Sequence, residues 1–377
     1  MEKYQSSIII YGIAACLALA FATVHDMKIP SNRQKSGIGA FQVGKETGIL
    51  PLVFKCLSAV PLLVIMALRD GVGTDYSSYA SDYKIIQHGG TTHTDAGFQA
   101  LSHVVAFFGF SHLVLFGICS VILISGVYAL AGIVENQLAM VVFLFLASFN
   151  YFISFSLISQ YTAIGVLCWA FTCLFRERYF FATVALLVAG SLHSSSFIFV
   201  PVFVIFVLLK KIPKYGRLIT GVVLFASVVG SSLLGILVPT LLKGTRFGGY
   251  LTDHKYSSLK SGSLIVICIA IAFFMVLVRL LVEKSSQDAT FQLLLIVQFV
   301  AMSLSLAQSQ ITLLFRMIYY FAFFAIIAIP YTMQFIRSRG MKTVVRCGVI
   351  ISYLVWVVLF PFSNNDYDVL PYHFIGL

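Results

Sequence analysis

Charged residues are scarce in this chain: Asp, Glu, Lys and Arg make up only 10% of its 377 residues, while 59% are hydrophobic. Soluble globular domains carry about 25% charged residues, so this composition excludes an ordinary water-soluble fold. The sequence also has no low-complexity tract, no convincing internal repeat and no hydrophilic stretch long enough for a soluble domain. We therefore interpret residues 1–377 as a single polytopic membrane domain.

Metal-binding cysteine motifs are also missing, and the start of the sequence does not have the pattern of a cleaved signal peptide. The seven cysteines form no CxxC motif and no Cys/His spacing, and most lie within apolar runs, so we interpret them as small core residues. The first apolar run starts at Ser6 and lacks both a basic preceding segment and a clear small-residue cleavage site. We expect it to be a retained helix and not a removed signal peptide.

Long apolar runs are abundant, and many have the length of about 18 to 22 residues that a membrane-spanning helix needs. A β-barrel would require alternating apolar and polar residues, which runs such as 264–282 lack. The sequence predicts an all-α fold with about twelve spans, at residues 6–24, 48–68, 112–131, 138–156, 159–175, 179–193, 195–210, 218–242, 262–282, 290–308, 312–334 and 344–362.

The basic residues indicate the orientation of these spans. The net charge of +11 is spread over short loops between apolar runs, so we expect no nucleic-acid partner. With twelve spans, sixteen basic residues lie in or beside the loops after the first, fifth, seventh, ninth and eleventh spans, and seven lie on the opposite face. The first face is therefore assigned to the cytoplasm. The loop near Glu135 also falls there, although it has no basic residue.

The outer face carries more polar sequence than its turns require. The segment 96–110 is too short to span the bilayer, and we expect a helix that lies in the outer interface. Two outer loops, 69–111 and 243–261, mix Arg, Asp, Tyr, His and Gly. We expect both periplasmic loops to form part of a functional site.

The stretch RDGVGTDYSSY at 69–79 holds several candidate binding groups. Arg69 is either an interfacial anchor or a phosphate clamp, since a guanidinium matches phosphate oxygens. Asp75 could accept a proton, orient Arg69 or bind sugar hydroxyls. The aromatic faces of Tyr76 and Tyr79 suit sugar rings or the membrane interface equally well.

Other candidates lie far along the chain. His193, at the outer end of its span, is either a packing residue or a general base. Arg246 lies in the loop sequence GTRFGGY, as a solvated charge or an anion contact. Arg316 lies about one turn inside a span with no acid nearby in sequence, so it needs a carboxylate, carbonyls, water or an anionic ligand.

A metal-binding pair of carboxylates is absent from the two outer loops. Neither 69–111 nor 243–261 contains a DxD motif, and the DYD at 366–368 only distantly resembles one. The three arginines fit an anionic ligand such as a polyprenyl diphosphate. This composition favours a metal-free and cofactor-free mechanism in which arginines offset the charge of the leaving group.

Several of these segments, in this order, resemble the EpsG/Wzy-type family of membrane polysaccharide polymerases. The stretch 69–79 is similar to the family's R-x-x-x-G-x-D-Y-x-x-Y element, and TDAGFQALSHVV to its acidic-Gly-aromatic segment, with Asp95 as the acid. SLHSSSFIFVPVF resembles its His hairpin, and TRFGGY and FRMIYY its later Arg…Tyr elements. One departure is Ser159, which stands where the family commonly has Arg before Gln160.

The resemblance implies a GT-C-like glycosyltransferase of the bacterial inner membrane, with its site facing the periplasm. It would join undecaprenyl-diphosphate-linked repeat units and release undecaprenyl diphosphate, and a separate partner would control chain length. We expect Arg69, Arg246 and Arg316 to contact the diphosphate, with Arg316 aiding catalysis, and His193 or Asp75 to take the acceptor's proton. The expected substrate contacts also include Asp70, Tyr76, Tyr79, Asp95, Gln160, Tyr250 and Tyr320.

Three other functions stay open at this point. An O-antigen ligase usually has a longer periplasmic loop between late spans than this chain offers. A lipid-linked oligosaccharide flippase should line a central cavity with basic residues, whereas the mid-span charges here are essentially Lys55 and Arg316. A membrane O-acyltransferase would need its His on the cytoplasmic side, and the predicted orientation puts His193 on the other face.

Overall fold

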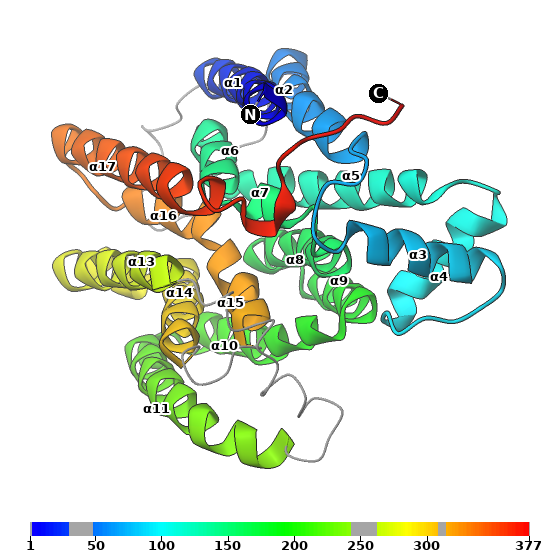
Figure 1. Cartoon of the computed structure of the whole chain (residues 1–377). Coiled ribbons are helices and arrows are strands. Elements are labelled where there is room, and N and C mark those ends of the chain that lie inside the picture. Colours follow the sequence, from blue (N-terminus) through cyan, green and yellow to red (C-terminus); the bar gives the residue numbers. More distant parts are fainter. Residues whose placement is uncertain (1, 30–47, 243–261, 308–313, 377) are drawn as a thin grey trace. The chain divides into compact units, whose positions relative to one another are not determined.

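The computed structural model describes residues 2–29, 48–242, 262–307 and 314–376, and the elements formed there are helices (Figure 1). Within these ranges the only pairing of extended backbone is an isolated bridge between Arg69 and Phe374. The predicted all-α polytopic class is therefore confirmed. The described chain divides into two compact units, Met1–Phe199 with Ile350–Leu377, and Val200–Val349.

Ten described helical segments are long and apolar enough to cross a membrane: Tyr4–Lys28, Ile49–Ala67, His112–Ala131, Ile158–Phe175, Ser194–Lys211, Pro213–Leu233, Ser263–Leu281, Ala289–Ala307, Phe315–Met333 and Arg339–Phe362. Two of the twelve predicted spans are shorter than expected. The segment 138–156 breaks at Phe149, whose φ of 63° is incompatible with a continuing helix. The segment 179–193 contains a helix of only 14 residues.

Up to Phe199, the described part of the first unit contains eight longer helices and two short ones. They are α1 (Glu2–Lys28), α2 (Ile49–Ala67), α3 (Tyr76–Gln87), α4 (Ala96–Phe107), α5 (His112–Ala131), α6 (Leu138–Ala147), α7 (Asn150–Ile153), α8 (Ile158–Phe175), α9 (Tyr179–Leu192) and the 3₁₀ helix η1 (Ser194–Phe199). α8 is the most buried of the long helices and packs against both α5 and α9. Apolar side chains all round α8 are what a central helix requires.

α1 and α2 lie side by side at one edge of this unit, as Figure 1 shows in dark and lighter blue. α2 also packs on α5, and α1 on α6. Gly126 of α5 and Gly165 of α8 face each other so closely that a Cβ on Gly126 would lie 2.1 Å from the Gly165 carbonyl oxygen. Small residues at this crossing therefore let the two helices approach.

The ends of α1 and α8 and the segment before α6 lie together at one end of the first unit. The carboxylate of Asp26, near the end of α1, accepts hydrogen bonds from the amides of Leu138 and Ala139 at the start of α6, both 3.0 Å long. A Cβ placed on Gly132 would lie 3.5 Å from Nη2 of Arg176, which follows α8. The acidic cap satisfies amides that a helix start leaves unpaired. The loop near Glu135 thus shares its end with Lys28 and Arg176.

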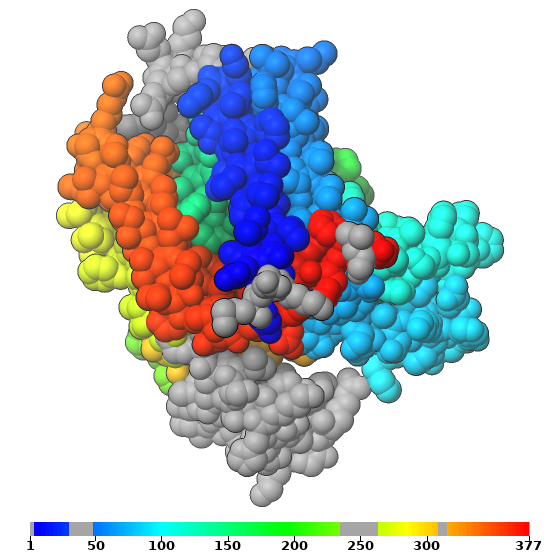
Figure 2. Space-filling view, turned by 45° about the horizontal axis from the view of Figure 1, so that its top comes forward, coloured from blue at the N-terminus to red at the C-terminus, as the bar shows by residue number. Residues whose placement is uncertain are grey.

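At the other end, the chain returns through a C-terminal tail, which we define as residues 363–376. It follows α17 (Arg339–Val357) and the π-helical turn η5 (Val358–Phe362), and it contains the short helix η6 (Asp366–Asp368). In Figure 2 the red tail lies between dark blue α1 and the blue residues that follow α2. Tyr11 donates to the Val369 carbonyl at 2.7 Å, and Tyr372 to the Ile65 carbonyl at 2.9 Å.

The second unit comprises α10 (Val200–Lys211), η2 (Pro213–Tyr215), α11 (Gly216–Leu242), α13 (Gly262–Leu281), η4 (Glu283–Gln287), α14 (Ala289–Ala307), α15 (Leu314–Phe323), α16 (Ala325–Met333) and the first part of α17. α14 is largely buried, and polar side chains fix its neighbours. Gln292 accepts from Thr220 at 2.6 Å, and Gln298 donates to the Phe321 carbonyl at 3.1 Å.

Candidate functional site

The loop 69–75 is held in place by carbonyls of the C-terminal tail. The amide of Asp70 donates to His373 O at 2.9 Å, and those of Gly73 and Thr74 donate to Asp368 O and Tyr367 O at 3.2 Å each. Backbone amides in a loop need acceptors when water is displaced. Here the acceptors come from residues about 300 positions later in the chain, which no local sequence pattern reveals.

Gly73 permits the close packing of this loop. Its φ is 110°, and a Cβ there would lie 2.7 Å from the carbonyl oxygen of Phe155. Both the backbone conformation and the contact exclude other residues. Ser156, next to Phe155, donates to Tyr367 O at 3.2 Å and accepts from Thr74 N at 3.0 Å. The loop, the chain before α8 and the tail therefore form one hydrogen-bonded assembly.

Arg69 lies fully inside this assembly, with only 1% of its surface exposed. Its guanidinium donates to the carbonyls of Met66 and, at 3.4 Å, Phe155, and lies 4.9 Å from the centroid of the Phe155 ring. Burial lowers the pKa of Arg69 to about 10, so it stays protonated at neutral pH. In this structure Arg69 joins the end of α2 to the turn before α8, and its predicted diphosphate contact stays a prediction.

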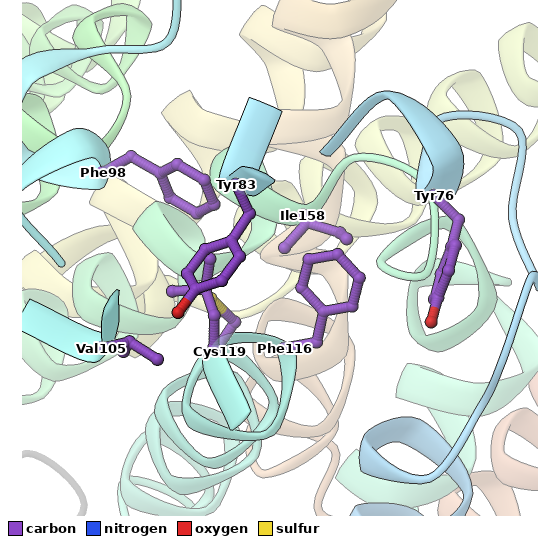
Figure 3. Packing of buried hydrophobic residues seen from close by; sticks show 8 residues of the cluster. Tyr76, Tyr83, Phe98, Val105, Phe116, Cys119 and Ile158 are labelled. Carbon is purple, nitrogen blue, oxygen red and sulfur yellow. The ribbon is translucent and has the colours of Figure 1, made fainter. Parts of the chain in front are cut away.

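α3 and α4 are packed on the first unit by an aromatic cluster. Tyr76 and Tyr83 of α3 and Phe98 of α4 lie with Phe116 of α5 and Ile158 of α8, all of them buried (Figure 3). The ring of Tyr76 meets that of Phe116 edge to face, with centroids 5.1 Å apart. Such buried aromatic contacts hold α3 rigidly, so the tyrosine hydroxyls of this helix are fixed in position.

Four polar side chains meet where α3, α4, α8 and α9 approach one another. Nδ1 of His193 lies 3.2 Å from Oδ2 of Asp95, with 20% and 30% of the two side chains exposed. Oγ of Ser159 lies 3.4 Å from the same nitrogen and 2.9 Å from the hydroxyl of Tyr79. A carboxylate only accepts, so it favours the proton on Nδ1 and leaves Nε2 as the basic nitrogen.

The backbone explains how Asp95 reaches His193. A Cβ on Gly97 would lie 2.6 Å from the carbonyl carbon of Ser191, so only glycine lets the start of α4 touch the end of α9. Asp95 immediately precedes α4, and His193 ends α9 in extended backbone with φ of −153°. Glycine at position 97 therefore brings two side chains together that are 98 residues apart in sequence.

The other predicted site residues of the first unit are placed separately. The hydroxyl of Tyr76 donates to Oδ1 of Asp70 at 3.1 Å. Asp75 is half-buried at the start of α3, and its backbone carbonyl accepts from the amide of Tyr79 at 3.1 Å. Gln160 is buried within α8. The structure thus joins Asp95, His193 and Tyr79 in one group, and Asp70 and Tyr76 in another.

The remaining predictions fall elsewhere. Arg316 is half-buried, with its guanidinium 5.8 Å from the ring centroid of Phe315, and Tyr320 is buried; both belong to the second unit. Arg246 and Tyr250 lie outside the described residues. Among the described residues, no group of three or more His, Cys, Asp or Glu side chains could hold a metal ion.

Comparison with known protein families decides the identity of the chain. The family model described as EpsG family matches residues 52–374, which is most of the sequence. The chain belongs to the EpsG family. A search of curated proteins and a search of solved structures each find no match. Membership supports a function of the polysaccharide-polymerase type, in an integral membrane protein.

The EpsG match includes residues that sequence reasoning did not select. It extends through the tail segment that holds the loop 69–75. Ser159, noted above only as a departure from the resemblance, connects Tyr79 to His193. His112 lies beside Tyr76. The position of His112 directly after the outer loop 69–111 could have identified it as a candidate site residue. No local sequence pattern identifies the tail.

Proposed function

We propose that this EpsG-family protein joins undecaprenyl-diphosphate-linked oligosaccharide repeat units at the periplasmic face of the bacterial inner membrane. The observation that carries the proposal is the group formed by His193, Asp95, Ser159 and Tyr79 in a chain of this family. All four side chains are polar and lie on packed helices or at their ends; His193, Asp95 and Tyr79 are partly accessible, whereas Ser159 is buried. Such a group suits the activation of a hydroxyl.

In the proposed reaction, Nε2 of His193 takes the proton of an acceptor sugar hydroxyl. The oxygen attacks the anomeric carbon of the donor glycan, the bond from that carbon to the diphosphate oxygen breaks, and the electron pair leaves with undecaprenyl diphosphate. Asp95 holds the tautomer of His193 and stabilises the imidazolium that forms, as a paired carboxylate does for a catalytic histidine. Tyr79 and Ser159 orient the ring and the acceptor.

Departure of the diphosphate requires positive charge, and Arg316 and Arg246 are the proposed source. Arg316 keeps the role that the family resemblance implies, since a guanidinium matches the oxygens of a phosphate and can offset their charge. We expect Arg316→Ala to shorten the glycan made in cells, measured by gel at matched protein level. Normal long-chain glycan from this variant would remove Arg316 from the mechanism.

The proposed function is tested with the purified full-length protein and lipid-linked repeat units. A ladder of polymer with release of undecaprenyl diphosphate is the expected result. Absence of product, with movement of the lipid-linked unit across vesicles, would instead identify a flippase. Transfer onto a lipid A-type acceptor would identify a ligase.

The role of His193 is tested in the same assay. His193→Gln should lower the rate by about 10²–10⁴-fold, the usual contribution of a general base. Asp95→Asn should lower it less and change its pH dependence, because the imidazolium loses its carboxylate partner. A rate within twofold of wild type for His193→Gln would exclude the histidine as the base.

A further inference from the structure

His112 is a histidine that the proposed reaction does not use, and it ends a hydrogen-bonded chain. It is the first residue of α5, and its Nε2 lies 3.4 Å from the hydroxyl of Tyr76. The same hydroxyl donates to Oδ1 of Asp70 at 3.1 Å. Asp70 is exposed and His112 half-buried, with the buried Tyr76 between them. The outer members of the chain are therefore open to a ligand.

The direction of the hydrogen bonds from His112 through Tyr76 to Asp70 determines which ring nitrogen of His112 can accept a further hydrogen bond. Burial and the bond to Asp70 raise the pKa of Tyr76 to about 12, so its hydroxyl keeps its proton at neutral pH. That proton goes to Asp70, so the tyrosine oxygen accepts from the N–H at Nε2 of His112. Nδ1 then carries a lone pair, and no described residue hydrogen-bonds to it.

The ring of His112 is also held in orientation. It lies edge to face against Tyr76 and Phe116, with centroids 6.0 and 5.4 Å apart. The charged groups that face it from neighbouring elements are Asp70, Lys84 of α3 and Arg69, whose guanidinium lies 5.7 Å from the Phe116 ring. A fixed ring with an open acceptor is prepared to bind a donor without losing conformational freedom.

α3 connects this group to His193. Tyr76 and Tyr79 are three residues apart, which puts them on one face of the helix. The hydroxyl of Tyr79 contacts Ser159, which in turn contacts His193, and the hydroxyl of Tyr76 contacts His112. One helix thus positions a tyrosine hydroxyl near each of two histidines. A reaction between two glycans also needs contacts to sugar hydroxyls that do not react, because these contacts hold the substrates in place.

We propose that His112, positioned by Tyr76 and Asp70, is a second carbohydrate-binding residue of the site, whose Nδ1 accepts a hydrogen bond from a non-reacting sugar hydroxyl of a lipid-linked glycan. This inference rests on the proposed function. Tyr76 and Asp70 are positioning residues here, because they act through the tautomer and orientation of His112.

The test compares variants of His112 in the full-length protein with lipid-linked repeat units. His112→Leu removes the acceptor, and we expect KM to rise about 3- to 10-fold with a smaller change in kcat, the effect of one lost hydrogen bond. His112→Asn, whose amide oxygen can replace Nδ1, should recover part of the loss. His103→Gln is the matched control, since His103 is exposed on α4 and should leave KM unchanged.

A double variant separates positioning from general structural damage. Tyr76→Phe should raise KM on its own, but adding it to His112→Leu should cause no further rise, because both act through one contact. Additive effects, or a KM for His112→Leu within twofold of wild type, would overturn the inference.

If the wild-type protein makes no polymer, the proposed function fails, and titration of the protein with the lipid-linked unit decides the inference instead. A Kd for His112→Leu equal to that of wild type overturns it, and a threefold or larger increase supports it.

Discussion

At position 73, a single glycine satisfies two requirements at once. Its φ of 110° lies outside the conformations that other residues adopt readily, and its α-carbon packs on the Phe155 carbonyl. Gly71 also has a positive φ, 65°, but nothing lies within 4 Å of a Cβ placed there. A side chain at Gly71 would therefore strain only the backbone, whereas a side chain at Gly73 would also clash with Phe155.

Backbone strain alone costs about 1–3 kcal/mol. We expect Gly73→Ala to lower the free energy of unfolding by more than this, since the steric contact adds to the strain. Thermal unfolding of the detergent-solubilised protein measures this loss. Gly71→Ala is the matched control and should cost less, because only the backbone conformation is disfavoured there. Equal losses of Tm in the two variants would contradict the packing argument.

Asp366 in the tail makes the stability of this region depend on pH. Desolvation raises the pKa of its carboxyl from 3.8 to about 6. The folded state therefore favours the protonated form, and the resulting stabilisation is full below about pH 4 and is lost as pH rises through about 6. Asp366→Asn should match wild type in Tm near pH 4 and exceed it near pH 8. Asp368→Asn, at an exposed neighbour, is the control for loss of charge alone.

At the scale of elements, the tail acts as the support of the loop 69–75. It accepts three amide hydrogen bonds from that loop, and Tyr372 bonds to both α1 and α2, through Ser7 Oγ at 2.8 Å and Ile65 O at 2.9 Å. Without the tail, these groups would lose their partners, which costs about 1–3 kcal/mol for each group that stays buried.

A stop codon after Asn364 should therefore abolish long-chain polymer and lower Tm. Tyr372→Phe, which removes one buried bond, should have a smaller effect of about 1 kcal/mol. Glycan length on a gel, at protein levels matched through an N-terminal tag, measures the first effect. Removal of residues 376 and 377 alone is the control. Long-chain glycan from the shortened protein would show that the loop holds its conformation without the tail.

For the whole molecule, the two ends of the first unit differ in charge and in chemistry. Asp26, Glu135 and Arg176 lie at one end, whereas Asp95, His193 and the loop 69–75 lie at the other. We propose that the first end faces the cytoplasm, because the sequence predicts an excess of basic residues on that face. The loop near Glu135, which lacks basic residues, is tied to that end by the bond from Leu138 to Asp26.

Cysteine labelling tests this orientation. Ser77→Cys on α3 and Glu135→Cys are both at exposed positions, and the background would carry serine at the exposed cysteines Cys16, Cys56 and Cys347. An impermeant thiol reagent added from the periplasm should label Ser77→Cys in intact cells, and Glu135→Cys only after the inner membrane is permeabilised. The same labelling pattern for both positions would exclude the proposed topology.

The membrane class of the protein and its family could be predicted from sequence, and the roles of the site residues stay predictions. Hydropathy is a local property, so apolar runs identify spans without knowledge of their neighbours. It did not reveal the break at Phe149, because left-handed backbone at a bulky residue depends on tertiary packing. Asp95 was predicted to orient a hydroxyl or an arginine, whereas its partner in the structure is His193.

By itself, then, the sequence determined that this chain is a polytopic helical membrane protein of the EpsG family, and which polar residues are unusual in such a chain. Only the tertiary structure decided which of them meet. Contacts between positions 95 and 193, 76 and 112, or 73 and 368 depend on how helices pack and where the tail returns. These contacts form only when the whole unit folds, because the two residues of each contact belong to different segments of the chain.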